Sequence, residues 1–255
     1  MTASRRLFLA AAVVAIWACI TIFGSLIQSG KGSLAEMVTT HIALAIPAAA
    51  LFLLVCAWAC GWRDLGLNGP RPRSSVKLLW PYAVYIGGLA VIAIMTREIP
   101  LHLLLIVAVN TALVGFSEEL AFRGVLWGAV RKAMSFWPGV FLVSAAFGAV
   151  HVMNALITGE LAAAGIQALN AFLSGLAFLA LRIRTRSLWP VIAAHGLWDM
   201  VLFLTVAGAA PSEQAGPSLA GVLFVTPIAL YGLWLLRKPE YRLVADGNPD
   251  QPPLA

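Results

Sequence analysis

The sequence has 255 residues, of which 61% are hydrophobic and only 11% are charged, and its formal net charge is +6. A water-soluble domain of this size carries about 25% charged residues, so these few charges could not cover a globular surface. The composition excludes an ordinary soluble enzyme, a nucleic-acid-binding module and a disordered chain, and it predicts an integral membrane protein. The excess of Lys and Arg is therefore interpreted as loop charge, with no nucleic acid as a partner.

Continuous apolar segments follow one another along the whole chain. They are Leu7–Ile27, Ile42–Trp62, Leu78–Met95, Leu101–Phe116 and its continuation, Trp137–Ile157, Leu161–Leu181, Leu188–Ala207 and Leu219–Leu236. Each has close to the roughly 20 residues that cross about 30 Å of hydrocarbon as a helix. None alternates with period 2, as barrel strands would. The predicted fold class is all-α, a polytopic membrane helix bundle with about eight transmembrane helices.

The positive charges orient these helices. If the N-terminus is cytoplasmic and eight spans alternate, only Lys31, Arg97 and Arg123 of the 17 Lys and Arg residues do not fall on the cytoplasmic side. Cytoplasmic loops of membrane proteins carry such an excess of Lys and Arg. The pattern predicts a multi-pass protein of the cell membrane with both termini cytoplasmic and a short outer loop at Ala210–Ser218.

Several ionisable residues lie where an apolar helix is expected. They are Glu118, Glu119, Arg123, His151, His195 and Asp199. A charge at the bilayer centre costs at least about 2.5–3.5 kcal/mol, so such residues indicate a functional site. Two further histidines, His41 and His102, begin spans on the predicted outer side and are interpreted as interface residues.

Spacing along the helices assigns neighbours to these residues. Glu119 and Arg123 are four residues apart and can pair along one helix face. Glu118 is rotated about 100° from Glu119 and is free to face another partner. Likewise, four residues separate Phe147 from His151 and His195 from Asp199.

The depths of the three motifs are compatible with one shared pocket. The segment from Leu101 to Arg131 is too long for one straight span, so we expect a tilt or a break near Gly115, Gly124 or Gly128. With that freedom all three motifs can meet inside the membrane, in a pocket expected to open toward the cytoplasm.

In this order the motifs resemble the CAAX-processing and bacteriocin-processing (CPBP, or Abi) family of intramembrane endopeptidases. Its pattern is Glu-Glu-x-x-x-Arg, then Phe-x-x-x-His, then His-x-x-x-Asn or Asp, and the resemblance covers roughly 101–207. The matching residues are Glu118, Glu119, Arg123, Phe147, His151, His195 and Asp199. Asp199 stands where the prenyl-protein endopeptidase branch usually has Asn, which weakens transfer of that branch's substrate. We therefore expect one transmembrane protease domain over 1–243, with its motif-bearing core near 101–207, and a disordered cytoplasmic tail over 244–255.

Hydrolysis of a peptide bond needs an activated water, a proton donor for the leaving amine and donors for the oxyanion. Glu118 is assigned as general base and acid, with His151 helping to hold the water. Glu119 would be neutralised by Arg123, and His195, oriented by Asp199, would stabilise the oxyanion. Phe147 is expected in the pocket wall.

A catalytic metal is the alternative within this interpretation. Glu118, His151 and His195 could supply a zinc shell with an open position. The family has often been described as metal-dependent, but the sequence lacks His-Glu-x-x-His, and we expect no bound cofactor.

Two other functions use similar residues. A proton-coupled transporter also needs intramembrane acids and histidines, but here they converge on three helices and no internal repeat is found. A non-catalytic membrane scaffold or immunity protein could retain the same pocket, although the intact motifs favour catalysis. For a peptidase the partners are the bilayer and a protein or peptide substrate: a prenylated Cys-a-a-X tail, a leader peptide or a C-terminal sorting signal.

Overall fold

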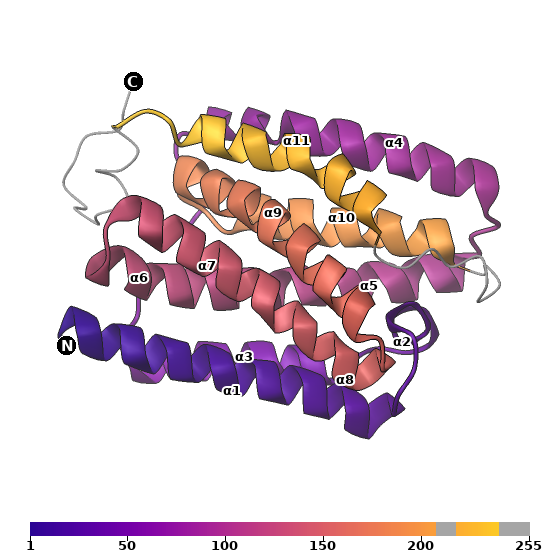
Figure 1. The fold of residues 1–255 in the computed structure, drawn as a ribbon, viewed down its shortest axis with the longest axis horizontal. Coiled ribbons are helices and arrows are strands. Elements are labelled where there is room, and N and C mark those ends of the chain that lie inside the picture. The colour runs from indigo at the N-terminus through magenta and orange to yellow at the C-terminus, as the bar shows by residue number, and fades with distance from the viewer. Residues whose placement is uncertain (208–217, 240–255) are drawn as a thin grey trace.

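The computed structural model describes residues 1–207 and 218–239, and within these ranges every regular element is a helix. Long helices lie side by side, and short helical segments join or interrupt them (Figure 1). In chain order the elements are α1 (Ala3–Ser29), α2 (Leu34–Thr40), α3 (Ala45–Ala59), η1 (Arg73–Leu79), α4 (Trp80–Thr96), α5 (Leu101–Glu119), η2 (Leu120–Leu126), α6 (Trp127–Ala133), α7 (Phe136–His151), η3 (Val152–Asn154), α8 (Ala155–Thr158), α9 (Leu161–Thr185), α10 (Trp189–Val206) and α11 (Leu219–Leu235). The predicted all-α helix bundle is confirmed.

Each predicted apolar segment contains a helix, but fewer than eight helices of the described chain qualify as spans. Six are long and apolar enough taken alone. A seventh results if α2 and α3, which are bent by 89° at a short break, form one span. α11 is shorter, with 17 residues. The count of about eight is thus approximate, because hydropathy marks apolar stretches and not where a helix bends or ends.

Two predicted features fall outside the described residues. Of the outer loop Ala210–Ser218 only Ser218 is described, and none of the tail Val244–Ala255 is.

Basic residues from distant parts of the sequence meet at one end of the bundle, here called the basic end. Arg6 on α1 and Arg131 on α6 both pair with Asp64, which follows α3. Arg184 near the end of α9 donates a hydrogen bond to the carbonyl of Leu235 at the end of α11. The start of α1 and the ends of α6, α9 and α11 therefore lie together (Figure 1). The charge pattern assigns the basic residues at these helix ends to one side of the membrane.

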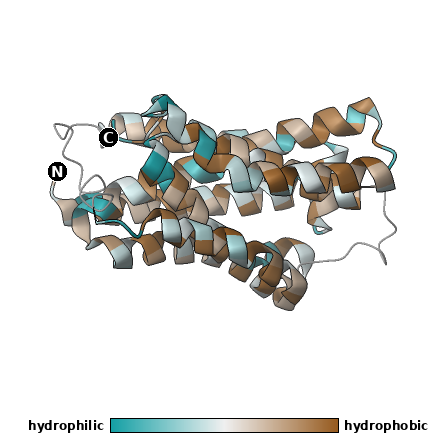
Figure 2. Cartoon of the chain, turned by 90° about the horizontal axis from the view of Figure 1, so that it is seen from above, coloured by the Kyte–Doolittle hydropathy of each residue, from teal (hydrophilic) through white to brown (hydrophobic). Residues whose placement is uncertain are grey.

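The outward surface of the helices is apolar. Large hydrophobic side chains such as Trp58, Ile94 and Leu223 are 84%, 73% and 75% exposed. In Figure 2 hydrophobic residues extend along the helices, and hydrophilic residues gather mainly toward the helix ends. Lipid tails solvate such a surface, whereas water does not. The chain is a multi-pass membrane protein.

Glycines allow α5 and α10 to approach closely. A Cβ added to Gly115 would lie 2.9 Å from the backbone nitrogen of Gly196, and a Cβ on Gly196 would lie 3.1 Å from the Thr111 carbonyl oxygen. Small residues permit this backbone contact between membrane helices. It places His195, the neighbour of Gly196, against the helix that carries Glu118 and Glu119.

α1 packs against the same helix from another direction. The indole nitrogen of Trp17 donates a hydrogen bond of 2.8 Å to Ser117 Oγ. Its ring also packs edge-on against Phe122, with 5.5 Å between the ring centroids. Trp17 of α1 thus contacts the chain just before and just after Glu118 and Glu119.

Candidate active site

The Glu-Glu-x-x-x-Arg motif lies where the α-helix widens into a π-helix. The helical run continues from Leu101 to Ala133 over 33 residues, and η2, over Leu120–Leu126, has π geometry. Sequence analysis expected a tilt or a break near Gly115, Gly124 or Gly128; the helix is not broken, and Gly124 lies inside the π segment. Short π segments within α-helices frequently occur at functional sites.

Glu119 and Arg123 form the ion pair that their spacing predicts. Arg123 Nη1 lies 3.0 Å from Glu119 Oε1, and both side chains are completely buried. Arg123 also donates a hydrogen bond of 3.3 Å to the carbonyl of Gly175 on α9, and its guanidinium lies 4.0 Å from the centre of the Phe147 ring. Through these two contacts Arg123 links η2 to α9 and α7. Loss of the cation would also leave Glu119 as a buried carboxylate without this countercharge.

Carboxylates approach His195 on α10 at both ring nitrogens. Its Nδ1 lies 2.8 Å from Glu119 Oε1. Its Nε2 lies 3.4 Å from Asp199 Oδ2 and 3.8 Å from Glu118 Oε2. Since a carboxylate only accepts, Nδ1–H donates to an ionised Glu119. Sequence analysis assigned the orientation of His195 to Asp199, but the shorter contact comes from Glu119, because α10 packs directly on α5.

His151 faces Glu118 from α7. A distance of 4.0 Å separates His151 Nε2 from Glu118 Oε2. The other ring nitrogen, Nδ1, lies 2.7 Å from the carbonyl oxygen of Phe147. A carbonyl can only accept, so Nδ1 carries a proton, and Nε2 is the ring nitrogen directed at Glu118.

A small cavity adjoins Glu118 and His151. Its volume is about 40 Å³, and its lining residues are Trp17, Ala18, Thr21, Ile22, Glu118, Val150, His151 and Asn154. Such a volume holds about one water molecule. Glu118 Oε2 and Thr21 Oγ1 are buried there with no hydrogen-bond partner among the described residues. One water within hydrogen-bond distance of both Glu118 and His151 fits their 4.0 Å separation.

The cavity lies away from the basic end. Sequence analysis expected the pocket to open toward the cytoplasm, the side to which the charge pattern assigns that end. Thr21 is about 22 Å along α1 from Arg6. Asn154 is close to Ile157, whose carbonyl accepts a hydrogen bond from Gly32 beyond the far end of α1. The rise per residue along a single helix gives the depth of each motif in the membrane. It does not show where the neighbouring helices leave a cavity.

Sequence reasoning missed the aromatic residues around the site. Phe178 on α9 stacks on His195, with 4.9 Å between ring centroids and 23° between planes, and Tyr82 on α4 stacks on Phe178 from farther out. Phe147, expected in the wall, packs edge-on against both histidines. Trp17, Phe178 and Tyr82 belong to no motif, and nothing in the sequence pairs them with the motif helices.

The two histidines set aside as interface residues remain separate from this cluster. His41 Nε2 lies 2.7 Å from Ser29 Oγ, and His102 is exposed in the first turn of α5.

No group of three or more His, Cys, Asp and Glu side chains in the described parts of the chain is arranged to hold a metal ion. His195 contributes its Nδ1 to Glu119, and its Nε2 faces two carboxylates.

Comparison with known proteins identifies the segment that carries the site. Residues 100–201 match the family model of Rce1-like type II CAAX prenyl endopeptidases. Searches of curated proteins and of solved structures gave no match. The matched segment contains the seven motif residues named above, and it is the same part of the chain that resembles the CPBP family.

Proposed function

We propose that the chain hydrolyses a peptide bond of a protein substrate through a water activated by Glu118; the match of residues 100–201 to the family model of Rce1-like CAAX endopeptidases supports this. The observation that carries the proposal is the position of Glu118. Its carboxylate is 3.8–4.0 Å from two imidazole nitrogens and borders a cavity the size of one water.

The reaction begins with the water between Glu118 and His151. Glu118 accepts one proton of this water while His151 Nε2 accepts a hydrogen bond from the other. The oxygen attacks the scissile carbonyl carbon, and the carbonyl oxygen becomes an oxyanion. When the tetrahedral intermediate collapses, the carbon–nitrogen bond breaks and Glu118 returns its proton to the leaving amine.

His195 stabilises the oxyanion. With Glu119 accepting from Nδ1, the ring is fixed so that Nε2 points toward Glu118 and Asp199. When both ring nitrogens carry protons, the ring donates to the oxyanion from Nε2. A fixed donor in a water-poor site contributes more than it would in water.

Glu119, Arg123, Asp199 and Phe147 are assigned to positioning. Glu119 orients His195 and is itself held by Arg123. Asp199 accepts from the same nitrogen that donates to the oxyanion. The Phe147 ring separates the Arg123 guanidinium from the histidines.

We further propose that no metal takes part in this chemistry. The alternative zinc set is Glu118, His151 and His195, but no group of three or more His, Cys, Asp and Glu side chains in the described parts of the chain is arranged to hold a metal ion. The test is cleavage of a peptide panel by the purified full chain in detergent, with and without a chelator. Equal rates are expected; loss of cleavage that zinc restores would contradict the metal-free reaction and leave the peptidase assignment standing.

The panel also addresses the substrate class. It contains a C-terminal Cys-a-a-X peptide with and without a prenyl group, a leader peptide with a double-glycine site and a peptide with a C-terminal sorting signal. The family model names prenyl endopeptidases, whereas Asp199 stands where that branch usually has Asn. If the purified protein cleaves none of these peptides in any detergent or at any pH tested, the peptidase assignment is overturned.

Orientation in the membrane follows from the basic end. We propose that this end, and with it both termini, is cytoplasmic, because positive charges concentrate on the cytoplasmic side. Reporter fusions in the loop that contains Arg182, Arg184 and Arg186 should report the cytoplasm. A reporter on the outer side at this loop would reverse the assignment.

A further inference from the structure

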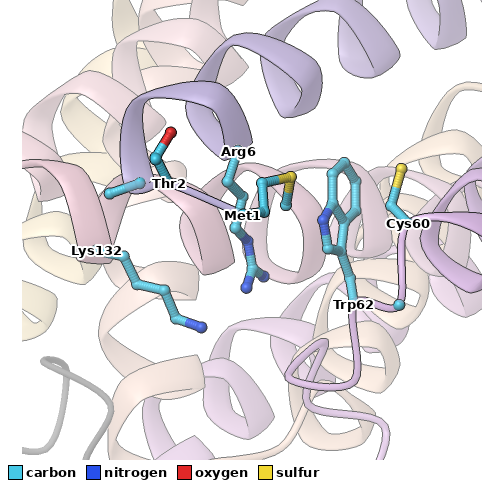
Figure 3. Close-up of a pocket in the computed structure, with 8 residues that line it drawn as sticks. Met1, Thr2, Arg6, Cys60, Trp62 and Lys132 are labelled. Atoms are coloured by element: carbon cyan, nitrogen blue, oxygen red, sulfur yellow. The ribbon is translucent and has the colours of Figure 1, made fainter.

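A second, larger pocket lies at the basic end, far from the candidate active site. Its volume is about 420 Å³, and its lining residues are Met1, Thr2, Ala3, Arg6, Cys60, Gly61, Trp62 and Lys132. Arg6 comes from α1, Trp62 from the turn after α3 and Lys132 from α6. Figure 3 shows the Arg6 and Lys132 side chains extending from different helices toward the same space. None of these residues belongs to the matched family motifs.

The positive charge around the pocket exceeds the negative charge. Asp64 pairs with Arg6, with Arg131 at 2.8 Å and with Lys132 at 3.0 Å. Burial opposes ionisation of Asp64, but hydrogen bonds from these three cations outweigh burial and hold the pKa of its carboxyl well below the usual range. Arg6 and Lys132, which both line the pocket, share this one carboxylate, so an anion in the pocket would meet a net positive charge.

Two buried N–H donors at the pocket have no acceptor. Arg6 is 7% exposed and Trp62 is 5% exposed. Neither Arg6 Nε nor the indole nitrogen of Trp62 has a hydrogen-bond partner in the described parts of the chain. The guanidinium carbon of Arg6 lies 5.6 Å from the centre of the Trp62 ring, so the two side chains that carry these donors are neighbours. A buried donor without a partner destabilises the fold, and an acceptor supplied by a ligand would remove that cost.

We propose that this pocket binds a phosphate group, with Arg6 Nε, Trp62 Nε1 and Lys132 Nζ as its donors. Phosphate offers several strong acceptor oxygens and negative charge, which suit an Arg and a Lys side by side. The pocket opens at the end of an apolar bundle, where the phosphates of phospholipids lie. Basic pockets between transmembrane helices bind anionic lipid headgroups. The phosphate can be carried by such a headgroup or can be a free ion.

The test measures binding through thermal stability of the purified full chain in neutral detergent micelles. The probes are short-chain phosphatidylglycerol, short-chain phosphatidylcholine and inorganic phosphate, each titrated at constant ionic strength. A ligand that binds only the folded state raises the melting temperature with its concentration. We expect a saturable rise with phosphatidylglycerol that exceeds the rise with phosphatidylcholine. A saturable rise with inorganic phosphate as well would identify the free ion as a second source.

Variants locate the binding. Lys132→Gln removes a cation that is partly exposed, and Trp62→Phe removes the indole N–H while keeping a ring. Each should weaken binding of phosphatidylglycerol, Lys132→Gln by about tenfold for the loss of one charge-assisted hydrogen bond. Arg5→Gln is the matched control, because it removes the same charge from an exposed position of α1 next to Arg6, and it should leave the binding unchanged.

The proposal fails if neither phosphatidylglycerol nor inorganic phosphate stabilises the wild-type chain. It also fails if Arg5→Gln weakens binding as much as Lys132→Gln does, since that result would indicate surface charge and not the pocket. Peptide cleavage by the Lys132→Gln variant, measured in parallel, should equal that of the wild type and keeps this test separate from the proposed peptidase activity.

Discussion

Two charged clusters in this bundle carry opposite imbalances. Inside the bundle one guanidinium, that of Arg123, pairs with Glu119, while two more carboxylates, those of Glu118 and Asp199, lie 3.8 and 3.4 Å from His195 Nε2. At the basic end one carboxylate, that of Asp64, faces three cations. A structural ion pair needs one partner of each sign, so among the described contacts each cluster holds more charge of one sign than a single ion pair uses. Surplus charge is where function is expected.

The two clusters also differ in exposure. The side chains of Glu119 and Arg123 are fully buried, whereas the side chain of Asp64 is 25% exposed and shares several cations. Loss of one partner should therefore be costly inside the bundle and tolerable at its end. The predictions below test this difference, from the largest expected effect to the smallest.

Arg123→Ala should strongly lower both folding yield and peptidase activity. It leaves Glu119 as a buried carboxylate without a countercharge, which costs about 3–5 kcal/mol. Arg131→Ala is the comparison, because Asp64 keeps Arg6 and Lys132, and its loss should cost about 1 kcal/mol or less. Melting temperature and yield of the two purified variants measure the difference. Equal stability of both variants would contradict the contrast between the clusters.

His195→Ala should slow cleavage about 10²–10³-fold, the usual effect of removing an oxyanion donor. The protein should still insert and fold, since α10 retains its glycine contact with α5. His102→Ala, at an exposed histidine of the same apolar chain, should leave the rate unchanged. Initial rates on one cleaved peptide decide the matter, and a normal rate for His195→Ala would remove this histidine from the mechanism.

The smallest effect is expected at Asp64, in its dependence on pH. Because folding lowers the pKa of this carboxyl, its stabilising contribution is complete above about pH 4, the pKa of an unfolded Asp, and is lost as the pH falls further. Asp64→Asn should therefore be less stable than the wild type at pH 7, by about 1–2 kcal/mol, and the difference should shrink in acid. A difference that stays constant from pH 7 to pH 3 would show that the ion pairs do not stabilise the fold.

The sequence predicted what depends on spacing along a single helix. Four-residue separation correctly paired Glu119 with Arg123, and the 100° rotation correctly turned Glu118 toward another partner. Contacts between helices could not be obtained in this way. The hydrogen bond from His195 to Glu119 depends on the close approach of α5 and α10 at Gly115 and Gly196, which hydropathy does not show.

The surroundings of the site were also beyond sequence reasoning. Trp17 and Thr21 lie on α1, about a hundred residues before Glu118 and outside the segment of family resemblance. Only the packing of α1 against η2 and α7 makes them neighbours of the active carboxylate. The π geometry of Leu120–Leu126 was likewise not predicted, because such segments are rare and occur as short interruptions inside α-helices.

The most direct test of the account compares Glu118→Gln with Glu119→Gln in one experiment, with cleavage rate and melting temperature measured for both. Glu118→Gln keeps the shape of the side chain and removes the base, so cleavage should fall about 10²–10⁴-fold while the melting temperature stays within a few degrees of the wild type. Glu119→Gln removes the countercharge of Arg123, so it should lower the melting temperature as well as the rate. Wild-type cleavage by a correctly folded Glu118→Gln variant would contradict the central claim that Glu118 activates the water.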